Sequence, residues 1–233
     1  MDLILQGVGG AELPALRFDP DEEPLFFIHH PNWSLPELAV VPVGLAFQVR
    51  RAGGPPPEVS LAKTELAGER DPRVPKDYLT ANLIGHFHYM LGVTLEERDW
   101  PRAESEFRRA AEAAPDNDVL FYNLGLIYRR NGLLDRAAAC FERSHEINPR
   151  HLASPGRVRS ADRLAEARTE LAAQEAAEAM LARDPSLAGL APGSAPYHLR
   201  LAALLEARGL PLAARGHRRR ALEEQARQAD SGP

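Results

Sequence analysis

The stretch YNLGLIYRRNGLLDRAAACF, residues 122–141, places one glycine inside a helical apolar pattern and a second glycine seven residues later. A glycine in a helix interior costs about 0.5–1 kcal/mol relative to alanine, so Gly125 needs a reason that lies outside its own helix. Gly132 follows Asn131 where the apolar pattern breaks, which is typical of a helix C-terminus. The stretch therefore predicts two helices joined by a tight turn, with the second helix packed closely against Gly125.

A repeat with a period of 34 residues contains this stretch. Residues 84–117 show the same order of features as residues 118–151, except that Gly125 follows Gly92 by 33 positions, so the first copy has a turn that is one residue shorter. Each copy predicts helix, turn and helix. The residue pairs that lie 34 positions apart are Trp100 and Leu134, Ala103 and Ala137, Phe107 and Phe141, and Pro115 and Pro149.

These positions resemble the tetratricopeptide repeat, whose pattern is Trp-x2-Leu-Gly-x2-Tyr, then Ala-x3-Phe, then Pro. The resemblance implies a mainly α protein in which helical hairpins stack into an α-solenoid, because one hairpin cannot bury its own outer faces. Within each hairpin we expect a small residue to face a small residue, with Gly125 against Ala137 and Gly92 against Ala103. The second copy carries Phe121, Leu124, Gly125, Tyr128, Ala137, Phe141 and Pro149. The first copy carries His88, Leu91, Gly92, Leu95, Ala103, Phe107 and Pro115.

The composition and the apolar periodicity of the sequence change several times along the chain. Apolar or alternating runs at 25–28 and 44–50 predict strands, and the glycine- and proline-rich residues 52–58 cannot hold a regular element. Residues 157–183 keep a helical period without a turn signal, which predicts one long helix, with a degenerate repeat as the alternative. The expected regions are a small α+β segment (1–51), a linker (52–75), two repeats (76–151), a long alanine-rich helix or degenerate repeat (152–190) and a degenerate terminal hairpin (195–229).

Composition and charge argue against several classes of protein. The chain has 233 residues, 44% of them hydrophobic, and its net charge of −5 gives no sign of a nucleic-acid-binding protein. No run approaches the ~20 apolar residues of a membrane helix, and the first ten residues lack the basic region of a signal peptide. We therefore expect a soluble, cytoplasmic protein that does not insert into a membrane, while its oligomeric state stays open.

No pattern of catalysis or metal binding stands out. His29 and His30 are adjacent and point to opposite faces of a strand, and His86 and His88 are two apart on a helix, whereas zinc sites use histidines four apart or several convergent ligands. Cys140, the single cysteine, excludes an internal disulfide and fits a small packing residue. We expect no enzymatic activity, no metal site and no cofactor.

One basic cluster lies near the end of the chain, and acidic residues follow it directly. Because no aromatic residue is interleaved to stack on bases, we expect a solvated terminal face rather than a nucleic-acid site. The cluster consists of Arg215, His217, Arg218, Arg219 and Arg220.

A second resemblance covers residues 24–50, where PLFFIHHPNW is followed by VPVGLAFQV. This segment is similar to a strand–loop–strand segment near the soluble C-terminal end of bacterial O-mannosyltransferase-like membrane glycosyltransferases. The resemblance implies an alternative function, in which the chain is an accessory soluble region of such a system and lies outside the cytoplasm.

The tetratricopeptide resemblance implies a binding face on the first helix of each repeat. In that family these helices line the concave surface, so residues that do not serve packing would contact a partner. Asn123 can donate to and accept from a peptide backbone, and Arg129 can pair with a carboxylate. We therefore expect a protein or peptide partner, with an acidic group as a candidate feature. The expected peptide-binding residues are His86, Tyr89, Val93, Tyr122, Asn123, Leu126, Arg129 and Arg130.

Overall fold

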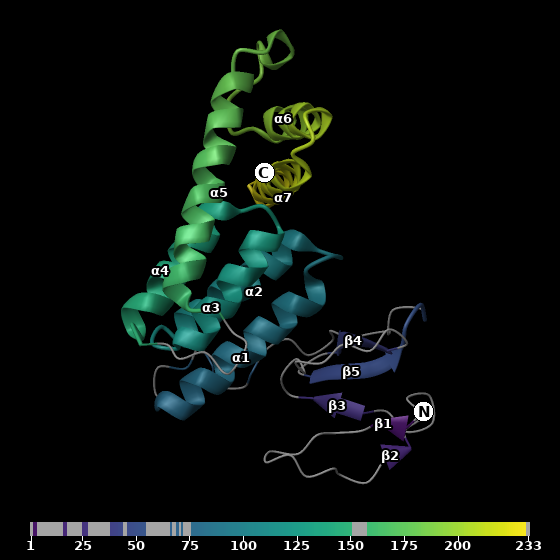
Figure 1. Ribbon diagram of the computed structural model, residues 1–233, viewed down its shortest axis with the longest axis vertical. Helices are drawn as coiled ribbons and strands as arrows, with labels where there is room; N and C mark the ends of the chain where they lie inside the picture. The colour runs from purple at the N-terminus through teal and green to yellow at the C-terminus, as the bar shows by residue number, and fades with distance from the viewer. Residues whose placement is uncertain are drawn as a thin grey trace. The chain divides into compact units, whose positions relative to one another are not determined.

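The structure is a computed structural model that describes residues 2–3, 16–17, 25–27, 38–43, 46–54, 66, 69, 71, 76–150 and 158–231 (Figure 1). The chain divides into two compact units, residues 1–67 and residues 68–233.

The elements described in the first unit are all strands. A strand pair, β1 (Asp2–Leu3) and β2 (Leu16–Arg17), is antiparallel, and a three-stranded antiparallel sheet has the order β3-β5-β4, with β3 (Leu25–Phe27), β4 (Leu38–Val43) and β5 (Ala46–Arg51). The predicted strands at 25–28 and 44–50 are confirmed as β3 and β5. The sequence did not single out β4, which contains Pro42; a proline is tolerated there because β4 lies at the sheet edge. The adjacent histidines at 29 and 30 lie outside the described residues.

The second unit is helical, as the sequence predicts. Two hairpins come first, and one long helix, α5, follows as expected for residues 157–183. The elements are α1 (Tyr78–Leu95), α2 (Trp100–Ala113), α3 (Asp118–Arg130), α4 (Leu134–Ile147), α5 (Ser160–Leu181), the 3-10 turn η1 (Pro185–Leu187), α6 (Ala195–Ala207) and α7 (Pro211–Asp230).

Side-chain caps fix where the repeat helices begin. Asp77, Asp99 and Asn117 each precede a helix and accept a hydrogen bond from a backbone N–H of its first turn. Each such cap stabilises a helix by about 0.5–2 kcal/mol. At the other end of α3, Gly132 takes a φ of +74°, the left-handed conformation that glycine adopts at little cost. The predicted helix end at Asn131–Gly132 is therefore confirmed.

Phenylalanine rings, rather than alanines, explain the two glycines inside the repeat helices. A Cβ added to Gly125 would lie 2.6 Å from Cε1 of Phe141, and one added to Gly92 would overlap the ring of Phe107 in the same way. We expected Gly125 to face Ala137 and Gly92 to face Ala103. That expectation is wrong, because the nearest side chain to each glycine is a phenylalanine. A methyl group at either glycine would occupy space that the neighbouring ring already fills.

Aromatic contacts continue from one hairpin into the next. The ring of Phe107 in α2 lies with its centroid 6.3 Å from that of Trp100 and 6.3 Å from that of Tyr128 in α3. Tyr122 meets Phe141 edge to face at 5.7 Å. Contacts of this geometry contribute about 0.5–1.5 kcal/mol beyond the burial of apolar area. The two hairpins therefore share one core, as stacked repeats require.

The last two helices form a hairpin beside the upper part of α5 (Figure 1). Its core includes Leu181 of α5, Leu201 and Leu205 of α6, and Ala214 of α7. From there α7 crosses the turn between α3 and α4, where the backbones of Gly132 and Gly216 come into direct contact.

The basic cluster at 215–220 is part of this crossing, so the expected solvated face is wrong for two of its members. His217 is 2% exposed and Arg219 is 9% exposed. The guanidinium of Arg219 lies 4.8 Å from the ring centroid of Trp100 and donates to Asn131 Oδ1 and Glu97 at 3.0 Å. The sequence did not reveal the burial of Arg219 because its partners lie about 90 to 120 residues earlier in the chain.

Candidate functional site

The first helix of the first repeat presents three of the expected binding residues on one face. His86, Tyr89 and Val93 of α1 are three or four positions apart and therefore lie on one side of the helix, and all three are half-buried. The rings of His86 and Tyr89 are stacked with centroids 6.4 Å apart, and Tyr89 also contacts Phe107 of the core. Packing thus holds these two rings in place, and both residues remain partly exposed.

The first helix of the second repeat continues this surface. Asn123, Leu126 and Arg130 of α3 share one face by the same spacing; the first two are half-buried, and the Arg130 side chain is 53% exposed. Arg130 donates through Nε to Glu96 at the end of α1, at 2.7 Å. Burial lowers the pKa of Arg130, but its hydrogen bonds with Glu96 outweigh burial and the pKa is raised. This ion pair joins the two helices that form the face.

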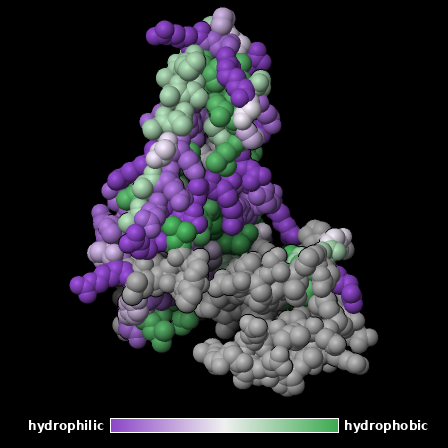
Figure 2. All heavy atoms as spheres, in the orientation of Figure 1, coloured by the Kyte–Doolittle hydropathy of each residue, from purple (hydrophilic) through white to green (hydrophobic). Residues whose placement is uncertain are grey.

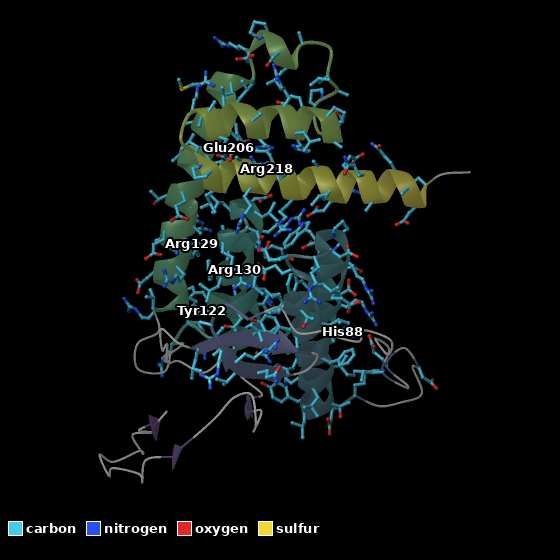
Figure 3. The ribbon with its side chains drawn as sticks, turned by 90° about the vertical axis from the view of Figure 1, so that its right-hand side faces the viewer. His88, Tyr122, Arg129, Arg130, Glu206 and Arg218 are labelled. Carbon is cyan, nitrogen blue, oxygen red and sulfur yellow. The ribbon has the colours of Figure 1, made fainter. Side chains whose placement is uncertain are left out.

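The remaining two expected residues face α5. Tyr122 is 2% exposed and donates its hydroxyl hydrogen to the carbonyl of Val158 at 2.9 Å. Arg129 pairs with Glu170 through two hydrogen bonds and with Glu166 at 3.1 Å. The hydrogen bonds from Glu170 raise the pKa of Arg129. Figure 3 shows Tyr122 and Arg129 on the side of the fold where α5 runs. The structure therefore places six of the eight residues on α1 and α3 in accessible positions.

Asn123 differs from the other asparagines of the helical unit. Among the residues that the structure describes, its amide has no hydrogen-bond partner, although it is half-buried. The others each hydrogen-bond a side chain or a backbone group: Asn82, Asn117, Asn131 and Asn148. Asn123 thus offers both a donor and an acceptor on the α1–α3 face.

Hydropathy varies along the visible face of the helical unit. Figure 2 shows hydrophobic side chains mainly in the upper part, where α5 and α6 lie, and in a small area over the repeat helices, while hydrophilic residues cover much of the rest.

His88, which occupies the tryptophan position of the first repeat, is buried between two carboxylates. Its Nδ1 lies 2.6 Å from Glu106 and its Nε2 lies 2.9 Å from Glu69, and Arg109 hydrogen-bonds both of these glutamates. The hydrogen bond from Arg109 and the charge of His88 lower the pKa of Glu69 against the effect of burial. This network ties Glu69, which precedes α1, to the first hairpin.

A cleft that the sequence did not reveal lies between α2, α4 and α7 and has a volume of about 1010 Å³. Its lining carries an ion-pair network in which Arg136 of α4 pairs with Glu104 of α2 at 3.0 Å and donates hydrogen bonds to Glu223 of α7 at 2.7 and 2.8 Å. Trp100 Nε1 also donates to Glu223, at 2.8 Å. The one local sign of this cleft in the sequence is Glu104, an acidic residue next to the packing residue Ala103.

Burial sets the electrostatics of this cleft. It raises the pKa of Glu104, and the attraction of Arg136 does not cancel the effect. Burial also raises the pKa of Glu223, but hydrogen bonds from Arg136 outweigh it and the net pKa is lowered. The pKa of the Cys140 thiol is raised to about 12 by burial. A raised pKa leaves little of the reactive thiolate near neutral pH, which is consistent with the predicted packing role of Cys140.

The described residues show neither a metal-binding cluster nor a membrane-spanning helix. Within the described ranges, no group of three or more His, Cys, Asp or Glu side chains could hold a metal ion. None of the described helices is long and apolar enough to cross a membrane.

The two similar hairpins, the 34-residue period and the repeated contact between glycine and phenylalanine define a helical-repeat protein. The family model described as tetratricopeptide repeat matches residues 119–151, which cover α3 and α4. Residues 119–151 therefore form a tetratricopeptide repeat.

Comparison with solved structures gave matches, one of which is named "MamA MSR-1 C2". The two chains are 24% identical, the match covers 62% of this chain and 78% of that chain, and the TM-score is 0.31. No curated protein matches the sequence. The comparisons do not show the resemblance of residues 24–50 to membrane glycosyltransferases.

Proposed function

We propose that this protein binds a peptide segment of a partner protein on the face that α1 and α3 form. The observation that carries the proposal is Asn123, the one asparagine of the described helical unit whose amide bonds no described residue. A peptide backbone offers a carbonyl and an N–H that one such amide can bond together. The helix that bears Asn123 belongs to the segment that matches the tetratricopeptide family.

The neighbouring side chains suit an extended or helical peptide. Val93 and Leu126 supply apolar contact, and Tyr89 offers a large apolar ring with a polar tip, a combination that is enriched at binding surfaces. The helix α5 borders α3 through its pairs with Arg129, and Val158, just before α5, bonds Tyr122, so this segment forms a wall beside the face. Because only two repeat helices contribute, we expect modest affinity.

An acidic group of the partner would meet Arg130. This side chain is accessible, but it already pairs with the buried Glu96. A ligand carboxylate would therefore share the guanidinium rather than gain an unpaired cation. Arg129 is paired twice with α5. These pairs favour recognition through apolar contact and backbone hydrogen bonds, with acidic groups as a secondary feature.

The test is a double substitution, Asn123→Ala with Leu126→Ala. Both residues are half-buried and lie outside the glycine–phenylalanine contacts, so the fold should be retained. Loss of one bridging amide and one apolar contact should weaken binding about 10- to 100-fold. The partner is first captured with the intact chain and its binding segment identified, and the dissociation constants are then measured by calorimetry.

A matched variant, Glu112→Ala with Glu142→Ala, changes two exposed residues on α2 and α4. It should bind the segment as the parent does. An unchanged dissociation constant for the Asn123 and Leu126 variant would remove the α1–α3 face from the proposal.

A further inference from the structure

A pair of histidines joins the two helices of the hairpin that α6 and α7 form beside α5 (Figure 1). Nδ1 of His198 in α6 lies 2.9 Å from Nδ1 of His217 in α7, and the two ring centroids are 5.1 Å apart. His217 is 2% exposed, and His198 is half-buried. His198 precedes Leu201 by three positions and His217 follows Ala214 by three, so the pair continues the apolar core of the hairpin by one turn.

The hydrogen bonds of the pair determine which nitrogens carry protons. Nε2 of His217 lies 2.9 Å from Oε1 of Glu178 in α5, and an ionised carboxylate can only accept, so this nitrogen carries a proton. Gln174 donates to the same oxygen at 2.6 Å and holds the carboxylate in place. When both rings are neutral, Nδ1 of His217 therefore has a lone pair and accepts from the N–H at Nδ1 of His198. A single hydrogen atom thus lies in the contact between the two rings.

This contact tolerates one added proton but not two. With a first proton, His217 becomes an imidazolium that donates to Glu178 from one nitrogen and to His198 from the other, while His198 keeps its own proton on Nε2. A second proton places an N–H on both facing Nδ1 atoms. Two donors and two positive charges then meet across 2.9 Å, and the bond between the rings is lost.

The surrounding groups also disfavour a charge on His198. Burial lowers its pKa most, and the charges of His217 and Arg220 in α7 lower it further. Glu178 of α5 and Glu224 of α7 attract a proton but do not compensate, and the pKa of His198 falls from 6.5 to about 4. Between these two pH values an opened hairpin binds more protons than the closed one. The closed hairpin therefore loses stability as the pH falls from about 6.5 toward 4.

We propose that the His198–His217 pair is an acid-sensitive latch, which lets α6 separate from α7 when both rings are protonated. Its opening exposes the apolar core around Leu201 and Leu205, which the closed hairpin buries against Leu181 of α5. The latch goes beyond the proposed peptide face, because it is built from α5, α6 and α7 rather than from α1 and α3. Either proposal can fail its test without affecting the other.

Amide hydrogen exchange of the intact chain at about pH 7 and about pH 5 measures the opening. The rates are converted to protection factors, which correct for the pH dependence of the exchange chemistry itself. The helices α3 and α4 serve as the internal reference. We expect the protection of α6 to fall at least about tenfold more than that of the reference between the two pH values. Equal changes in the two regions overturn the proposal.

Two histidine variants locate the effect. His198→Asn keeps a donor to His217, because the amide N–H of asparagine takes the place of the Nδ1–H, but it cannot take up a proton. Its α6 protection should change less than about threefold relative to the reference between the two pH values. His145→Asn, which replaces a half-buried histidine of α4, should open as the parent does. A loss of protection in His198→Asn as large as in the parent overturns the proposal.

Should His198→Asn fail to fold, the parent chain decides. The ring Cε1–H resonance of His198 is followed by NMR during a titration from neutral to acidic pH. We expect the midpoint of its shift below about pH 6, in the direction that burial and the neighbouring cations set. A midpoint at or above about pH 6 shows that the closed hairpin does not oppose this proton, and it overturns the proposal.

Discussion

Replacing Gly132 with alanine should release α7 from the two repeats. Gly132 has a φ of +74°, and a Cβ at this position would overlap the carbonyl oxygen of Leu212 in α7. The left-handed conformation costs an alanine about 1–2 kcal/mol, and the displaced backbone adds about 1–3 kcal/mol by analogy with overpacked cores. Repeat proteins can unfold locally, one part at a time. We therefore expect the loss of stability to appear first as detachment of the α6–α7 hairpin from the repeats.

Hydrogen exchange and chemical denaturation measure this effect, and Gly209→Ala is the matched control. Gly209 also has a φ of +74°, but no described atom lies within 4 Å of the place its Cβ would take. The control keeps the backbone strain without the clash. We expect Gly132→Ala to raise exchange in residues 211–230 far more than Gly209→Ala does. Equal effects of the two variants would show that α7 does not depend on this contact.

Replacing Gly125 with alanine should destabilise the second repeat although alanine is the better helix former. The added Cβ would lie 2.6 to 2.9 Å from three atoms of the Phe141 ring. Overpacking of this kind costs about 1–3 kcal/mol, which exceeds the gain of about 0.5–1 kcal/mol from helix propensity. Leucine at the same position should cost at least as much. Thermal and urea unfolding give the change in the free energy of unfolding.

A double-mutant cycle isolates the contact. Phe141→Ala by itself should cost about 3–5 kcal/mol, because Phe141 is fully buried. In that background the ring is absent, so Gly125→Ala should become neutral or stabilising by the propensity difference. A destabilisation by Gly125→Ala that is the same with and without the Phe141 ring would contradict our explanation of this glycine.

The sequence predicted the parts of the fold that depend on local pattern. The period of 34 residues located all four repeat helices, and the glycine after Asn131 marked the end of α3. The partner of Gly125 was misassigned because the repeat pattern marks Ala137 and Phe141 equally and does not say which side chain reaches the glycine. The strand β4 was not singled out because Pro42 weakens the strand pattern, and only its place at the sheet edge permits the proline.

The parts that depend on long-range packing could not be predicted. Arg219 looks like a member of a solvated basic cluster until α7 crosses the turns of both repeats. His217 looks solvated until α7 packs against Glu178 of α5 and His198 of α6. Tyr122 and Arg129 look available until α5 packs beside α3. The cleft around Glu104 exists only because α7 closes one side of it. In each case, the helix that buries these residues lies far away in the sequence. The spacing of residues within one helix does not show which distant helix will pack against it.

The most direct test of the proposed peptide face is photo-crosslinking from single positions of the intact chain. Benzoylphenylalanine is placed at position 126 in α3, on the proposed face, or at position 112 in α2, where Glu112 is exposed. The partner segment identified with the intact chain is added, and the crosslinked products are mapped by mass spectrometry. Our account predicts crosslinks to the segment from position 126 and none from position 112. Crosslinks from position 112 without any from position 126 would contradict it.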